Sequence, residues 1–143
     1  MKKNEYKTQV EASKNLLKKE TNLNNVVRND IPKYEIIKQL IVGLESEFVN
    51  LKKIVSVDFE VNDEAVAKAE KISKIAFALQ SCLNVDKGEE VAVNLTWLYR
   101  FVRYSCKRII DNEDLTYVKP AHLVARNLKE GWLNMPEESR QIN

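Results

Sequence analysis

The scarcity of turn-forming residues constrains the fold of this chain more than any other feature. Only three glycines and three prolines occur among 143 residues, whereas β-sandwiches and barrels need a turn signal after every short strand. We therefore expect long helices. The length suits one domain with its own hydrophobic core, and the 44% apolar and 31% charged residues are ordinary for a globular protein.

Four segments carry the apolar spacing of amphipathic helices. Capping side chains or prolines mark their expected starts near Pro32, Asn62, Asp86 and Pro120. Apolar residues then recur at intervals of three and four positions. The expected core residues outside the third helix are Ile37, Leu40, Ile41, Leu44, Phe48, Leu51 and Val55, then Ala65, Ala69, Ile72, Ala76, Leu79 and Leu83, then Ala121, Val124, Leu128 and Trp132. This pattern predicts an all-α fold, an antiparallel four-helix bundle.

Two local features of these helices lead to specific expectations. Gly43 in the middle of the first helix costs about 1 kcal/mol relative to alanine, and we expect close approach of a neighbouring helix backbone to offset it. Asp86 and Glu89 have the spacing of a capping box, with Asp86 as the N-cap of the third helix.

The chain divides into three parts on composition. Residues 1–30 are polar and rich in lysine and asparagine, and we expect a mobile N-terminal arm or short helix outside the core. Residues 31–135 form the bundle domain, and residues 136–143 form a polar C-terminal tail. The net charge of +2 is too small to imply a polyanionic partner by itself.

The two cysteines and the absence of long apolar runs indicate a cytoplasmic protein. Cys82 and Cys106 lie inside helical patterns without metal-ligand spacing, as expected for buried thiols in a reducing compartment. No apolar run approaches 18 residues, and the N-terminus lacks the hydrophobic region of a secretion signal. We expect neither membrane insertion nor a cofactor.

The third helix carries two apolar stripes instead of one. At 3.6 residues per turn, one stripe faces the bundle and comprises Val91, Leu95, Leu98, Val102 and Ile109, flanked by Ala92, Tyr99 and Cys106. The opposite stripe comprises Val93, Trp97, Phe101 and Tyr104, with Arg100, Arg103 and Lys107 between the two. The second stripe is either further core, covered by the arm or by other helices, or an exposed groove for a partner.

The same helix resembles a family signature. "GEEVAVNLTWLYRFV" is similar to the third-helix motif of the flagellin export chaperone family (FliS-type), through Gly88, Glu89, Ala92, Asn94, Leu95, Leu98 and Tyr99. "IPKYEIIKQLIVGLE" resembles the family's first helix, "NLKEGW" resembles its terminal helix, and Tyr6 is the counterpart of its N-terminal tyrosine. The chain departs from the family where Tyr104-Ser105-Cys106 and Ile109-Ile110 replace the usual residues.

The resemblance implies an all-helical cytosolic chaperone without catalytic residues. Such a protein binds the C-terminal segment of flagellin, prevents its premature polymerisation, and delivers it to a component of the flagellar type III export gate. The partner-binding residues expected from the resemblance and the second stripe are Tyr6, Asn94, Leu95, Trp97, Leu98, Tyr99, Phe101 and Tyr104.

Other functions are weighed against this one. The only histidine is His122, which excludes a multi-histidine metal site, and no phosphate-binding glycine motif occurs. Nucleic-acid binding is the main rival, because Arg100, Arg103, Lys107 and Arg108 interleave with aromatic residues, but the small net charge disfavours it. A diverged bundle that serves as an adaptor or regulator for another partner remains open.

Overall fold

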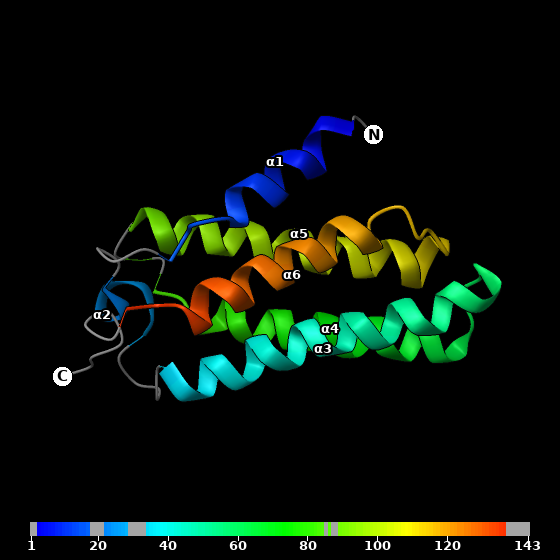
Figure 1. Ribbon diagram of the computed structural model, residues 1–143, viewed down its shortest axis with the longest axis horizontal. Helices are drawn as coiled ribbons and strands as arrows, with labels where there is room; N and C mark the ends of the chain where they lie inside the picture. The colour runs from blue at the N-terminus through cyan, green and yellow to red at the C-terminus, as the bar shows by residue number, and fades with distance from the viewer. Residues whose placement is uncertain (1–2, 18–21, 29–33, 85, 87–88, 137–143) are drawn as a thin grey trace.

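The computed structural model describes all residues except 1–2, 18–21, 29–33, 85, 87–88 and 137–143. Four long helices follow one another along the chain: α3 (Tyr34–Asp58), α4 (Asp63–Ser81), α5 (Glu90–Asn112) and α6 (Val118–Leu133). Successive helices run antiparallel, and α6 returns to pack on α3 and close the bundle (Figure 1). The predicted all-α four-helix bundle is confirmed.

Two short helices precede the bundle. The first, α1 (Lys3–Ser13), lies against α6 and α5 on the outside of the bundle, and α2 (Leu23–Val26) lies at one end, near the start of α5 (Figure 1). Of the two expected forms of the N-terminal segment, the structure contains the short helix. No helix in the part of the chain that the structure describes is long and apolar enough to cross a membrane.

The core is built from the positions that the helical spacing selects. In α4 the small residues Ala65, Ala69 and Ala76 are fully buried, and small side chains at a helix contact allow neighbouring helices to approach closely. The predicted core residues of α3, α4 and α6 are all buried except Leu40, which is half-buried against the same core. Apolar spacing alone therefore identified the buried face of each helix.

The helix starts were predicted with mixed success. The Asn62 side chain accepts a hydrogen bond from the Ala65 amide at 2.8 Å and is the N-cap of α4, as predicted. Pro120 lies in the first turn of α6, also as predicted. The capping box of α5 is wrong, because the helix begins at Glu90 with Glu89 as an N-cap that makes no side-chain cap bond, which leaves Asp86 outside. The predicted start at residues 29–32 lies outside the described residues.

The expected role of Gly43 is also wrong. A Cβ atom built on this glycine would meet no atom within 4 Å, so no neighbouring backbone approaches it. Because nothing offsets the poor helix propensity of glycine here, Gly43→Ala is expected to raise the free energy of unfolding by about 1 kcal/mol. Urea denaturation followed by circular dichroism measures the change. A loss of stability would show that the glycine has a packing role that the structure does not contain.

An ion pair in which two arginine donors share one carboxylate oxygen closes the turn between α5 and α6. Arg108 donates to Asp114 Oδ2 from Nη2 at 2.6 Å and from Nε at 3.0 Å. Asp114 Oδ1 accepts from the Thr116 amide at 2.9 Å, and Glu113 ends α5 in the left-handed conformation. Hydrogen bonds from Thr116 and then from Arg108 lower the Asp114 pKa to about 2.

This turn predicts a loss of stability in acid. The pKa of Asp114 in the folded chain lies below the ordinary aspartate value of 3.8. Its contribution to stability is therefore fully present above 3.8 and is lost as pH falls through about 2. Asp114→Asn is expected to lower the free energy of unfolding at pH 7 and to flatten its decline in acid. Equilibrium unfolding measured at several pH values compares the two proteins. Identical pH profiles would contradict the role of this carboxylate.

The N-terminal segment was expected to lie outside the core, but four of its apolar residues are buried, namely Leu17, Leu23, Val26 and Val27. Val27 forms an isolated antiparallel bridge with Leu83, in which the Arg28 amide donates to the Cys82 carbonyl at 2.9 Å. Leu17 and Val27 lie outside regular helices, where helical spacing carries no information. Their contribution was therefore not visible in the sequence.

A polar contact fixes α1 to the bundle. The Asn127 side chain on α6 donates to Ser13 Oγ at 2.9 Å and to the Val10 carbonyl at 3.4 Å. Ser13 is itself almost completely buried, so these bonds are shielded from water. Asn15, in the left-handed conformation that asparagine tolerates better than most residues, follows the helix.

The cysteines are free thiols, one buried and one half-buried. Burial raises the pKa of Cys106 to about 12, which keeps this thiol protonated and unreactive. The expectation of a buried thiol is confirmed for Cys106, whereas Cys82 at the end of α4 is only half-buried.

Candidate partner-binding surface

The two stripes of α5 have different environments. Leu95, Leu98 and Tyr99, all predicted to contact a partner, are buried in the bundle. Burial also raises the pKa of the Tyr99 hydroxyl. These three residues hold α5 in the core, and in this conformation a partner cannot reach them.

The second stripe is exposed at three of its four positions. Trp97 is 57% exposed and Tyr104 is 46% exposed, and Val93 also faces solvent. Phe101 is half-buried and meets Tyr117 edge-on, with 6.3 Å between ring centroids. The helix α1 contacts α5 but leaves Trp97 and Tyr104 accessible. The second stripe was interpreted either as further core or as an exposed groove, and Val93, Trp97 and Tyr104 are exposed.

Arginine side chains lie over two of the exposed aromatic rings here, those of Trp97 and Phe77. The Arg100 guanidinium lies 5.1 Å from the Trp97 ring centroid, and Arg103 lies 4.8 Å from that of Phe77 on α4. Arg103 also donates to Gln80 Oε1 at 3.0 Å. These cation–π contacts place positive charge on an apolar surface. Phe77, which is exposed, was missed from the sequence, although it is an aromatic residue outside the predicted seam of α4.

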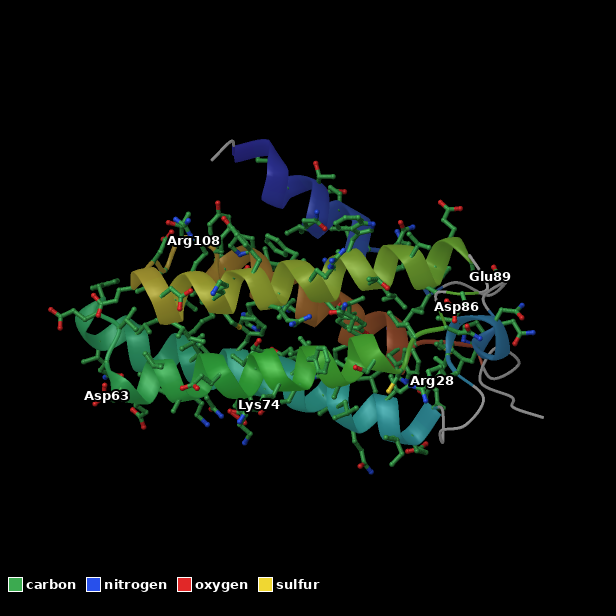
Figure 2. All side chains as sticks on the ribbon, turned by 180° about the vertical axis from the view of Figure 1, so that it is seen from behind. Arg28, Asp63, Lys74, Asp86, Glu89 and Arg108 are labelled. Atoms are coloured by element: carbon green, nitrogen blue, oxygen red, sulfur yellow. The ribbon has the colours of Figure 1, made fainter. Side chains whose placement is uncertain are left out.

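A shallow groove runs between α4 and α5 beside these residues. It has a volume of about 540 Å³ and is lined by Ser73, Arg100, Arg103, Tyr104, Lys107, Ile110 and Asp111. A second hollow of about 420 Å³ shares Ser73, Arg103 and Ile110 and extends the groove to Phe77 and Lys74. Figure 2 shows this side of the molecule, with α4 and α5 side by side and Lys74 labelled on α4. We name Val93, Trp97, Arg100, Tyr104, Phe77 and Arg103 the aromatic surface.

Two of the four cations proposed for nucleic-acid contact are already paired within the chain. Lys107 lies 2.6 Å from Asp111, and Arg108 holds Asp114 in the turn described above. Affinity for nucleic acid depends on the number of phosphates that basic side chains neutralise. The aromatic surface therefore offers a polyanion mainly Arg100 and Arg103.

The remaining predicted residues lie elsewhere. Asn94 is half-buried and lines a different cavity of about 440 Å³, which is enclosed by the end of α1, residues near α2 and the start of α5. Tyr6 is part of α1, but its side chain lies outside the described residues. The predicted set is therefore divided among the core, the aromatic surface and the α1 side of α5.

His122 makes contacts that join two helices of the bundle. Its Nε2 lies 2.6 Å from Glu45 Oε2, and Lys52 Nζ lies 3.2 Å from Nδ1. Because an ammonium group only donates, Nδ1 accepts and the Nε2–H donates to Glu45. Burial opposes ionisation of Glu45, but hydrogen bonds from His122 and Lys129 outweigh it and lower the Glu45 pKa. The described partners of His122 include no serine or cysteine nucleophile, so the residue joins α3 to α6.

Comparison with known proteins agrees with this architecture. The family model for the flagellar protein FliS matches residues 19–139, which include all four bundle helices and leave α1 outside. Searches of curated proteins and of solved structures find no match. FliS is a family of flagellar export chaperones and not of enzymes. Since the matched region covers most of the chain, this protein belongs to the FliS family.

Proposed function

We propose that this protein binds the C-terminal segment of flagellin on the aromatic surface, prevents its premature polymerisation, and brings it to the flagellar export gate in the cytoplasm. Family membership supports a flagellar export chaperone. The observation that supports the place of binding is the exposure of Trp97 and Tyr104 on α5 and of Phe77 on α4, which Arg103 of α5 contacts. Exposed aromatic residues that gather in one region are typical of protein-binding sites.

The chemistry of the surface suits an amphipathic helix. A segment that is disordered alone can fold on binding by laying its apolar face into a groove between two helices. The groove between α4 and α5 provides that site, with Tyr104 in its lining and Trp97 beside it under Arg100, which also lines the groove. Such aromatic anchors lose little conformational entropy on binding. Arg100 and Arg103 favour acidic side chains beside the apolar face and repel basic ones.

The binding step is tested by calorimetric titration of the chain with a peptide of the flagellin C-terminal segment. We expect one-to-one binding in the nanomolar to micromolar range, and a blue shift of Trp97 emission as the peptide removes its ring from water. Purified flagellin should also polymerise more slowly with an equimolar amount of the chain. A peptide that does not bind would refute the proposal.

The delivery step needs a separate experiment. The cytosolic domain of the export-gate component is added to the chain alone and to its complex with flagellin, and binding is followed by sedimentation velocity. A ternary complex is expected, and failure to form it would restrict the function to cargo binding.

Two controls address the rival functions. Binding to a single-stranded oligonucleotide at low salt that weakens steeply with added salt would favour a nucleic-acid ligand. Retained peptide binding after loss of the Trp97 ring would place flagellin elsewhere on the bundle and leave the aromatic surface to another partner.

A further inference from the structure

The turn between α3 and α4 exposes two large apolar side chains. Phe59 is 82% exposed and Val57 is 76% exposed, more than any other large apolar residue that the structure describes. Both lie at the end of the bundle where α3 turns into α4, the right-hand end in Figure 1. We name Val57 and Phe59 the tip. It is remote from Trp97, in the first half of α5, and the proposed cargo site does not require it.

The backbone conformation at Phe59 is unfavourable for a phenylalanine. Phe59 has φ 54°, in the left-handed region that bulky residues rarely adopt, and its amide caps α3 through the Val55 carbonyl at 2.9 Å. Glycine or asparagine would close the same turn with less strain. Because the ring is in solvent, packing within the chain does not compensate for this conformation.

Acidic side chains predominate in the segment that carries the tip, and the nearest lysine before it is Lys53, one helical turn before Val57. Residues 54–67 contain no lysine or arginine, and the exposed carboxylates of Glu60, Asp63 and Glu64 follow Phe59 directly. Figure 2 labels Asp63 at this end of the molecule. An occupant of the tip must therefore combine an apolar cavity with a basic rim.

The same molecule has a pocket of that kind. A cavity of about 330 Å³ between α1 and α6 has Val10, Pro120 and Leu123 as its apolar lining, with Lys7 and Lys119 at its edge. Both lysines are exposed, and neither is in an ion pair among the described side chains. An enclosed cavity of about 150 Å³ already admits benzene, so the volume of this open pocket is sufficient for a phenyl ring.

The tip and the pocket lie toward the same end of the bundle. The turn from α5 into α6 supplies Thr116 to the pocket, and the first turn of α6 supplies Lys119; both are at the end where α3 turns into α4 (Figure 1). When one end of a molecule carries both a protruding side chain and a pocket that accepts it, two copies related by a two-fold axis can form the same contact twice. We propose that the chain forms a two-fold homodimer in which Phe59 of each protomer enters the pocket between α1 and α6 of its partner, and Glu60 approaches Lys119.

Sedimentation equilibrium over the micromolar to millimolar range tests the dimer. The weight-average mass is expected to rise from 16.6 kDa toward twice that value and to stop there. Phe59→Asn should raise the dissociation constant by at least about tenfold and also raise the melting temperature, because asparagine tolerates the left-handed backbone. Phe77→Ala, which removes an exposed aromatic ring elsewhere, should leave the dimer unchanged.

A charge exchange tests the pairing of tip and pocket. Glu60→Lys and Lys119→Glu should each weaken self-association, because each places like charges at both contacts. An equimolar mixture of the two variants should restore a dimer, since both contacts again join opposite charges. A mass that stays at one protomer, a mass that rises beyond two, a dimer unaffected by Phe59→Asn, or a mixture that stays dissociated would each overturn the proposal. None of these measurements involves flagellin, so they are independent of the proposed function.

Discussion

The Trp97→Ala variant is expected to bind the flagellin C-terminal segment about ten- to thirty-fold more weakly than the native chain and to unfold at the same temperature. Tryptophans at the centre of an interface commonly contribute about 2 kcal/mol or more when truncated. Because Trp97 is mostly exposed and packs mainly beneath Arg100, its removal leaves no cavity in the core. Calorimetric titration gives the affinity, and thermal unfolding followed by circular dichroism gives the stability.

Two variants control for unspecific effects on binding. Ile36→Ala removes an exposed apolar side chain from α3 and should leave the affinity unchanged. Trp97→Phe retains a smaller ring and should fall between the native chain and Trp97→Ala. If Trp97→Ala unfolds at a lower temperature and binds normally, the ring is part of the fold and the aromatic surface is not the cargo site.

Trp132→Ala is expected to show the opposite result, with a loss of about 3–5 kcal/mol in the free energy of unfolding. This ring is 2% exposed and stacks on Tyr34 with 5.7 Å between centroids. Its Nε1 donates to the Tyr34 carbonyl at 3.2 Å, and the Tyr34 hydroxyl donates to the Trp132 carbonyl at 3.0 Å. Urea denaturation measures the loss.

Trp132→Phe separates the packing of this residue from its hydrogen bond. The phenyl ring keeps most of the apolar contact but leaves the Tyr34 carbonyl without this donor, at a cost of about 1–3 kcal/mol. A Trp132→Ala protein as stable as the native chain would mean that the link between the start of α3 and the end of α6 contributes little.

The sequence predicted the fold because local spacing and global packing agree. In α4 the apolar residues Ala65, Ala69, Ile72, Ala76 and Leu79 recur at intervals of three and four, and these are the residues that the structure buries. The failures concern local details that periodicity does not encode. Asp86 satisfies a capping pattern, yet α5 begins later, and Gly43 suggested a close contact that the structure does not contain.

The candidate site was predictable only in part. Helical geometry placed Trp97 and Tyr104 opposite the bundle-facing stripe but left open whether they are core or exposed, and the structure exposes both. A family signature contains core residues as well as partner-binding residues. Leu95, Leu98 and Tyr99 were therefore predicted to bind a partner, but they are buried in the core. The contribution of Phe77 depends on how α4 lies beside α5, which no property of either segment alone reveals.

The contact between Tyr34 and Trp132 also has a consequence for the order of folding. It joins residues 98 positions apart, so it forms only after the chain has closed a long loop and α6 has met α3. Closing such a loop costs conformational entropy before the contact between the two residues can stabilise the folded chain. The Trp132 ring therefore reports the docking of α6 on α3, a step that requires long-range closure of the chain. In a Trp97→Phe protein, stopped-flow fluorescence should detect closure of the bundle separately from the earlier gain of helix.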